Sequence, residues 1–202
     1  MSRKLGLPIV LMLVLAMTRC PGLMDPNFSA VYGLVFCAGV YFPGRMAWWL
    51  PLTTLFLTDL LLNWHYGVDL INGYMLANYV AYVGILWLGR RFTARASWLS
   101  LLGGGILGAI LFYLVTNTFA WMQNAEYLKT FGDWIRALTV GTSGWPQTWE
   151  FFRNTIISGG LFTGLFAGAM KLAAKMEAEE EPEEEGQSEP EPVEAEPEEA
   201  QP

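Results

Sequence analysis

Long apolar runs separated by short polar junctions dominate residues 1–176 of the chain. Six such runs recur, at residues 5–17, 28–42, 46–64, 74–88, 98–121 and 149–172. A helix of about 20 residues crosses the hydrocarbon core of a bilayer, because each residue adds about 1.5 Å. Charged side chains fall mainly between the runs, as insertion into a membrane requires. The pattern therefore predicts an all-α, polytopic membrane helix bundle of about six transmembrane helices.

Two segments depart from this simple pattern. The run 5–17 is short and follows Arg3 and Lys4, so it resembles the core of a signal peptide. No small-x-small cleavage site follows it, which favours an uncleaved first helix, and cleavage would leave the remaining topology unchanged. The connection 123–147 is the longest between two runs and carries Trp134 and Trp145. We predict that it contains an interfacial element, because tryptophan is enriched at membrane surfaces.

Charge divides the chain into two parts. Thirteen of the 19 acidic residues are glutamates between Glu177 and Glu199, and the rest of the chain carries 12 basic against 6 acidic side chains. The segment 177–202 has almost no large apolar side chains, so it cannot offset the entropy of an ordered chain. We predict a transmembrane domain at 1–176 and a disordered Glu/Pro-rich tail at 177–202. The tail is either a solubilising extension or an acidic contact for a basic partner.

Positive charge is unevenly distributed between the two sides that six alternating spans create. Eight basic residues fall on the side of the N-terminus and four on the other. The first group comprises Arg3, Lys4, Arg45, Arg90, Arg91, Arg95, Lys171 and Lys175, and the second comprises Arg19, Lys129, Arg136 and Arg153. Cytoplasmic loops carry the excess of Lys and Arg. We therefore predict a multi-pass protein of the bacterial inner (plasma) membrane with both termini in the cytoplasm.

Polar side chains occur within four of the runs, at a depth where they are costly and often functional. The orientation predicted from charge brings them to one level, in the outer third of the membrane. They are Asp59 and Asn63 in the third run, Tyr74 and Asn78 in the fourth, Asn117 and Trp121 in the fifth, and Arg153 and Asn154 in the sixth. A mixed polar and aromatic pocket that opens outward suits capture of a small molecule. We predict that these eight residues bind a substrate.

Two other interpretations of these side chains stay open. Polar groups near the ends of spans can meet the membrane interface, where aromatic side chains form belts. Asp59 can also pair with Arg153 and so fix the bundle. In the pocket interpretation, Asp59 binds a cationic group and Arg153 an anionic one, while Tyr74 and Trp121 stack on the ligand.

Glycines recur at four-residue spacing in the last two runs. They are Gly104 and Gly108 in the fifth run and Gly160, Gly164 and Gly168 in the sixth. Small faces of this kind let helix backbones approach closely in a membrane. We predict that the five glycines pack helices within the chain, with contact to another membrane subunit as the alternative.

Other chemistry finds little support in the sequence. His65 is the single histidine, and Cys20 and Cys37 lack the spacing of metal ligands, so we predict no metal and no cofactor. The sequence contains neither a Gly-Lys-Ser/Thr phosphate loop nor a Gly-x-Ser-x-Gly turn. We therefore predict no enzymatic activity, and we expect no nucleic-acid partner. The predicted topology disfavours a disulfide, which would require both cysteines to reach the oxidising side.

Several short motifs carry a resemblance to a known class of membrane protein. They are Asn27-Phe28-Ser29-Ala30, Gly39, Pro51, Asp59, Asn117 and Phe151-Phe152-Arg153-Asn154-Thr155. In these residues the chain resembles an uncharacterised bacterial family of small six-span membrane proteins, over about residues 5–175. That family is similar to the substrate-binding (S) subunits of energy-coupling-factor transporters.

This resemblance implies capture of a vitamin-like molecule from outside, with a coupling transmembrane subunit and a pair of ATPases driving its uptake. In that class a small-xxx-small face on the first helix contacts the coupling subunit. The run 5–17 lacks such a face because Leu11, Leu13, Val14 and Leu15 are bulky. The leading prediction is thus a substrate-capture subunit embedded in the lipid bilayer. The alternative is a non-transport scaffold of the envelope that recruits partners through its spans and acidic tail.

Overall fold

Seven α-helices make up the part of the chain that the structure describes. This computed structural model covers residues 3–185, and the surroundings of side chains are defined for residues 6–176. The helices are α1 (Arg3–Thr18), α2 (Val31–Tyr41), α3 (Met46–His65), α4 (Gly73–Gly89), α5 (Trp98–Gln123), α6 (Phe131–Thr139) and α7 (Thr148–Glu185). Residues 3–185 contain no β-strand, so the all-α prediction is confirmed. Each of the six predicted runs corresponds to one helix, and the connection 123–147 contains α6.

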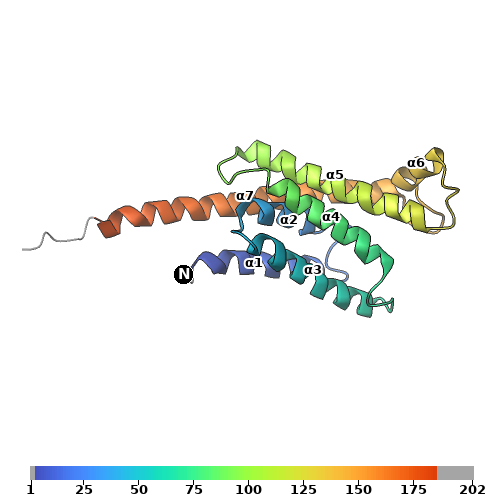
Figure 1. The fold of residues 1–202 in the computed structure, drawn as a ribbon, viewed down its shortest axis with the longest axis horizontal. Helices are drawn as coiled ribbons and strands as arrows, with labels where there is room; N and C mark the ends of the chain where they lie inside the picture. Colours follow the sequence, from blue (N-terminus) through green and yellow to red (C-terminus); the bar gives the residue numbers. More distant parts are fainter. Residues whose placement is uncertain (1–2, 186–202) are drawn as a thin grey trace, which may run out of the picture.

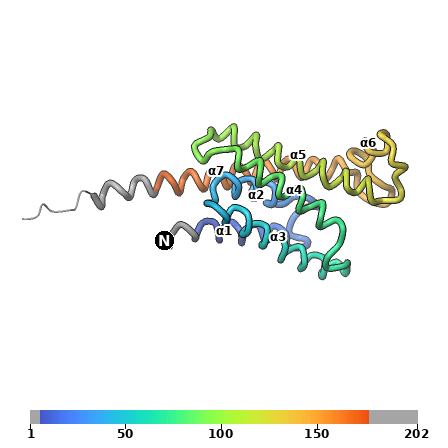
Figure 2. Tube along the Cα trace, in the orientation of Figure 1, coloured from blue at the N-terminus to red at the C-terminus, as the bar shows by residue number. Residues whose placement is uncertain are grey.

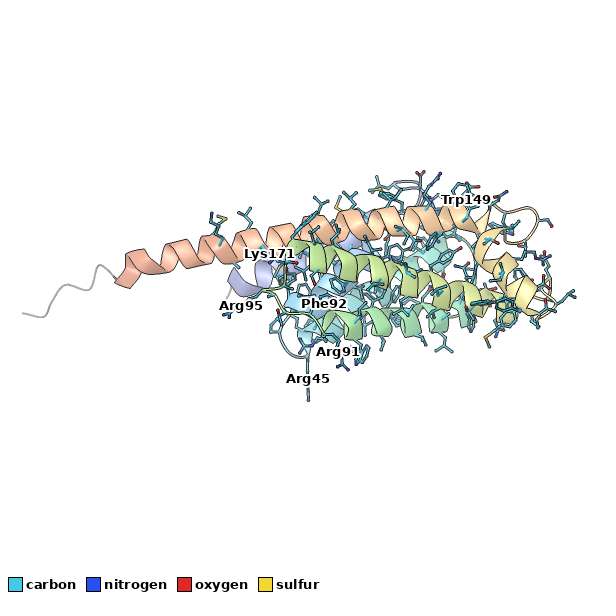
Figure 3. All side chains as sticks on the ribbon, turned by 90° about the horizontal axis from the view of Figure 1, so that it is seen from above. Arg45, Arg91, Phe92, Arg95, Trp149 and Lys171 are labelled. Carbon is cyan, nitrogen blue, oxygen red and sulfur yellow. The ribbon has the colours of Figure 1, made fainter. Side chains whose placement is uncertain are left out.

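The helices other than α6 run in alternating directions, so the bundle has two chemically different ends. The start of α1 and the far end of α7 lie at the same end, and α6 lies at the other (Figure 1). Figure 3 shows Arg45, Arg91, Arg95 and Lys171 gathered at the first end, which we call the basic end, and Trp149 at the opposite end. Four of the eight basic residues that the sequence assigns to one side therefore lie at the same end of the bundle.

Helix α2 lies in the middle of the bundle and is the shortest helix apart from α6. It packs against α4, α5 and α7 (Figure 2), and every residue from Val31 to Gly39 is buried. Its 11 residues extend about 16 Å, whereas the 26 residues of α5 extend about 39 Å. The central helix therefore stops short of the opposite end, and the segment 19–30 borders the space beyond it.

Helix α2 begins three residues later than the predicted run, which started at residue 28. Asn27 adopts a left-handed conformation with φ of 60°, and the Phe28 amide donates to the carbonyl of Asp25 at 2.9 Å. Asparagine tolerates this conformation in turns. The predicted start was wrong because Phe28 is apolar but lies in a turn, and hydropathy does not report turn geometry.

Glycines allow the closest approaches between helices. Thr163 of α7 lies against Gly33 of α2 and Gly105 of α5. A Cβ built on Gly33 would lie 2.8 Å from the carbonyl carbon of Phe162, and one built on Gly105 would lie 2.6 Å from the Cβ of Thr163. Side chains larger than hydrogen are therefore excluded at these two positions, neither of which belongs to the predicted set.

Four of the five predicted packing glycines face a neighbouring element of the same chain. A Cβ built on any of these four would lie within 4 Å of side-chain atoms of another helix. The four are Gly104, Gly108, Gly160 and Gly164. Gly168 differs, because nothing lies within 4 Å of its Cβ position.

Two helical segments are long and apolar enough to cross a membrane, Trp98–Gln123 and Thr148–Met176. Shorter apolar segments occur at Gly6–Thr18 and Val31–Tyr41. Length and composition alone therefore identify two candidate spans among the described residues, fewer than the six predicted.

The connection between α5 and α7 is folded around the amphipathic helix α6. Thr130 caps α6 by accepting a hydrogen bond from the amide of Asp133 at 3.2 Å. Ala137 faces inward and is buried, whereas Phe131 is exposed. Arg136 of α6 lies over Tyr127, which precedes this helix, with its guanidinium carbon 4.9 Å from the centroid of the tyrosine ring. Burial in this folded connection raises the pKa of the Tyr127 hydroxyl.

Helix α7 continues beyond the predicted last span, which ended at residue 172. It reaches Glu185, so the first residues of the segment predicted as a disordered tail are helical. Glutamate and alanine, which dominate this stretch, are good helix formers. The remainder of the predicted tail, residues 186–202, lies outside the described residues.

Candidate functional site

A cavity of about 460 Å³ lies at the end of the bundle opposite the basic end, beyond the first turn of α2. We call it the main cavity. The segment 19–29 borders it, and five helices contribute its walls. The wall residues are Thr18 of α1, Val31 and Tyr32 of α2, Leu62 of α3 with Tyr66 just after it, Asn78 and Tyr82 of α4, and Phe112, Thr116 and Asn117 of α5. Its volume suits a small organic molecule.

Three aromatic rings form a continuous apolar wall of the main cavity. The rings of Tyr32 and Phe112 have centroids 4.9 Å apart, and those of Phe112 and Tyr82 are stacked at 5.5 Å with an interplanar angle of 18°. Tyr32 and Tyr82 are buried, so their orientation is fixed by packing. Such a surface can stack against a planar ligand.

Two amide side chains give the main cavity its polar wall. Asn117 donates through Nδ2 to the carbonyl of Tyr113 at 2.9 Å, which leaves its Oδ1 available. Asn78 makes no hydrogen bond among the described residues, so both of its polar atoms are available. Thr116 donates to the carbonyl of Phe112 at 2.9 Å and can still accept. The cavity therefore offers both donors and acceptors without a net charge on this wall.

Arg19 and Asp59 form an ion pair beside the main cavity, between the end of α1 and the middle of α3. Arg19 Nη2 contacts Asp59 Oδ1, and Arg19 Nη1 donates to the hydroxyl of Tyr82 at 3.4 Å. Only 11% of the Arg19 side chain and 6% of the Asp59 side chain are exposed. Each charge therefore depends on the other, because an unpaired buried charge is costly.

The alternative prediction, a pair between Asp59 and Arg153, is wrong. Arg153 is exposed, and its guanidinium carbon lies 5.4 Å from the centroid of the Trp149 ring on the same helix. Arg19 directly follows α1, which packs against α3 and so brings this arginine to Asp59. The rotation of α7 about its axis turns Arg153 away from Asp59. The sequence pattern did not determine this rotation.

A second cavity, of about 370 Å³, lies between α3 and α4. Four of the predicted binding residues line it: Asp59, Asn63, Tyr74 and Asn78. Its remaining lining residues are Val68, Asp69, Asn72 and Met75. Asn78 borders both cavities, whereas Asp59 borders only the second. The structure thus separates residues that the sequence grouped in one pocket.

The segment 19–29 is held over the main cavity from two sides. Asn154 of α7 donates through Nδ2 to the carbonyl of Pro26 at 3.0 Å. The hydroxyl of Tyr32 donates to the carbonyl of Asn27 at 3.2 Å. Asn154 therefore positions this segment and does not itself line either cavity.

Two further predicted binding residues lie outside both cavities. Trp121 accepts a hydrogen bond at its carbonyl from Lys129 at 2.7 Å, and its indole nitrogen is buried without a partner. Arg153 lies over Trp149, as described above. Neither side chain lines the main or the second cavity.

Sequence reasoning missed three parts of the main cavity. Arg19 was counted only among the basic residues of one side of the membrane, and its place in the main cavity was not predicted. Tyr82 follows Asn78 by four residues and so lies on the same helix face, a spacing that could have identified it. The border formed by segment 19–29 left no pattern in the hydropathy, because its polar and apolar residues alternate irregularly.

Ligands for a metal do not gather in the described part of the chain, where no group of three or more His, Cys, Asp or Glu side chains occurs. Cys20 is exposed and Cys37 is buried in α2, and both are free thiols. The groups that line the two cavities are amides, hydroxyls, aromatic rings, the Arg19–Asp59 pair, the carboxylates of Asp25 and Asp69 and the thiol of Cys20.

Comparison with curated proteins and with solved structures finds no match. A family model matches residues 1–182, which include all seven helices except the last residues of α7. By this match the chain belongs to DUF6580, a family of unknown function.

Proposed function

We propose that the chain is an integral membrane protein in which α1, α3, α4, α5 and α7 cross the bilayer, while the short helix α2 together with the segment 19–30 makes the crossing between α1 and α3. Apolar side chains point outward at intervals of three or four residues on several helices. Exposed examples are Ile9, Leu13 and Met17 of α1, Leu57, Leu61 and Trp64 of α3, Leu76, Val80, Val83 and Trp87 of α4, and Ile157, Leu161 and Leu165 of α7. Proteins in water rarely expose such continuous apolar surface. A bilayer would cover it, with α2 enclosed by its neighbours.

The distribution of charge supports one orientation of this bundle. The basic end carries Arg45, Arg91, Arg95 and Lys171, and Lys and Arg are in excess on cytoplasmic loops. In this orientation both termini face the cytoplasm, and the main cavity opens on the other side of the membrane. Helix α6 then lies at the outer membrane–water interface.

Fusions to alkaline phosphatase, which is active only outside the cytoplasm, test the orientation. We expect a fusion after Lys175 to be inactive and a fusion after Gly144, in the connection between α6 and α7, to be active. Activity after Lys175 would contradict the proposed orientation. Equal activity of the two fusions would contradict the assignment of α7 as a span.

Within this membrane protein, we propose that the main cavity captures a small polar molecule with a planar part. The observation that carries this proposal is the cavity itself, which combines an aromatic wall with the amide group of Asn78 and the available amide oxygen of Asn117. Polar groups inside a membrane protein are usually retained for function.

The resemblance to S subunits extends this proposal to uptake. The captured molecule would be vitamin-like, and a separate coupling subunit with its ATPases would supply energy. The chain itself has no phosphate-binding loop that could hydrolyse ATP.

A screen of water-soluble vitamins and related heterocycles against the detergent-purified protein tests capture. A true ligand at 100 times its Kd stabilises the folded state by about 2.7 kcal/mol, which raises the thermal midpoint. We expect Asn117→Ala to weaken that ligand about tenfold, since it removes a hydrogen bond. The matched control Asn124→Ala, at the same end of the bundle but outside the main cavity, should bind normally.

Asp59 is unsuitable for this test, because its loss also breaks the pair with Arg19. The absence of any stabilising compound, together with wild-type behaviour of Asn117→Ala in cells, would contradict capture. That outcome would favour the scaffold interpretation.

A further inference from the structure

The carboxylate of Asp59 is only half engaged. Its Oδ1 contacts Arg19, but its Oδ2 is buried and has no hydrogen-bond partner among the described residues. The residue as a whole is 5% exposed and lines the second cavity. A buried charged acceptor without a partner costs stability. Asp59 Oδ2 is therefore an acceptor that lacks a hydrogen-bond donor.

Two amide side chains add acceptors to the same cavity. Asn63 donates through Nδ2 to the carbonyl of Leu70 at 3.0 Å, which leaves its Oδ1 available. Asn78 makes no hydrogen bond among the described residues and lines the cavity from α4. Together with Asp59, these residues offer three oxygen acceptors from two adjacent helices.

The charge around the second cavity favours a ligand with one positive charge. No basic side chain lines it. Arg19 and Asp59 compensate each other, which leaves the carboxylate of Asp69 at the rim as the net charge. A single positive charge balances this carboxylate, whereas a divalent ion would leave an excess.

Size distinguishes an organic cation from a bare ion. The second cavity holds about 370 Å³, whereas a site for one water-sized particle needs only about 10–15 Å³ by the same measure. Val68, Met75 and the ring of Tyr74 provide apolar surface beside the acceptors. An ammonium group has three N–H donors and no acceptor, which matches the three oxygens, and a short carbon chain would cover the apolar surface.

We propose that the second cavity binds a small primary amine, whose ammonium group donates to Asp59 Oδ2, Asn63 Oδ1 and Asn78 Oδ1. This inference goes beyond the proposed function, because it concerns a different cavity and a different ligand. Asn78 lines both cavities, and Asp59 of the second cavity forms an ion pair with Arg19, which lines the main cavity. Amine binding is therefore energetically linked to binding in the main cavity, and the linkage is reciprocal.

Isothermal titration of the detergent-purified full chain with n-butylammonium chloride tests the proposal. We expect saturable binding of one equivalent. n-Butanol, which has the same carbon chain without charge, and tetramethylammonium, which has no N–H donor, should not bind measurably. Binding of either compound as tight as that of butylammonium would overturn the proposal. Sodium chloride that displaces the amine at equal concentration would also overturn it, in favour of a bare ion.

Matched substitutions locate the site. Asn78→Leu should weaken butylammonium about tenfold, since it removes an acceptor for a charged donor. Asn117→Leu, a change of the same kind in the main cavity alone, should leave amine binding unchanged while reducing capture of the other ligand. Asp59→Asn should abolish amine binding if the variant folds. Unchanged amine affinity in Asn78→Leu would overturn the assignment, whatever the outcome for the main cavity.

Discussion

Asp59→Ala should destabilise the folded protein by about 3–5 kcal/mol, the largest loss we expect from any side-chain truncation in the bundle. The substitution leaves the guanidinium of Arg19 in place with 11% of its side chain exposed and no carboxylate beside it. The hydroxyl of Tyr82 remains as an acceptor at 3.4 Å but carries no charge to compensate the arginine. Thermal unfolding in detergent, followed by tryptophan fluorescence, measures the loss.

Two comparisons separate this effect from a general sensitivity to substitution. Arg153→Ala removes an arginine that is exposed and lies over Trp149, so it should cost less than about 1 kcal/mol. The double variant Arg19→Met and Asp59→Leu should recover most of the stability, since it removes both buried charges. A double variant that is less stable than Asp59→Ala would contradict the view that the uncompensated charge causes the loss.

Much of the fold could be predicted because it follows from hydropathy. The predicted runs and the observed helices agree within a few residues at most boundaries, since bounded apolar runs identify long helices. Helix α2 is the informative exception. The predicted run 28–42 begins in a turn at Asn27, and the helix within it has only 11 residues, fewer than a helix needs to cross a bilayer. The space beyond this short helix is the main cavity, so the feature that hydropathy described least well positions the site.

The sequence predicted at which end of the bundle the candidate site lies, because that depends only on the position of each polar residue along its helix. Alternating helix directions bring Asn78 and Asn117 to the same end, and these two do share the main cavity. Rotation about each helix axis is a separate variable, which the distribution of polar residues did not determine. The observed rotation of α7 places Arg153 on an exposed face. Asp59 instead pairs with Arg19, which the sequence analysis used only to predict the orientation in the membrane.

The spacing of glycines likewise predicted only part of the helix packing. Regular spacing identified Gly160 and Gly164, which have room for contact with neighbouring side chains at ordinary distances or slightly below. It also identified Gly104, where a Cβ would lie 2.8 Å from Cε2 of the Phe36 ring. The tightest contacts with the backbone of another helix involve Gly33, Gly39 and Gly89, which lie outside the predicted set. A close approach needs a small residue only at the crossing point, so one glycine without any periodicity is sufficient.

Gly33→Ala should destabilise the protein by about 2–3 kcal/mol, even though alanine favours a helix over glycine by about 1 kcal/mol. The added methyl would lie 2.8 Å from the carbonyl carbon of Phe162, so it meets the backbone of α7 and not the end of a flexible side chain. Relief requires the two central helices to move apart, and every residue of α2 from Val31 to Gly39 is buried. Thermal unfolding of the purified variant measures the change.

The matched control is Gly168→Ala, on the same helix α7 that Gly33 contacts. Nothing lies within 4 Å of its Cβ position, so the methyl meets no neighbour and the helix gains up to about 1 kcal/mol. The two substitutions have identical chemistry and should therefore have opposite signs. A Gly33→Ala variant as stable as Gly168→Ala would show that α2 and α7 are farther apart than described, and the position of α2 that leaves room for the main cavity would have to be revised.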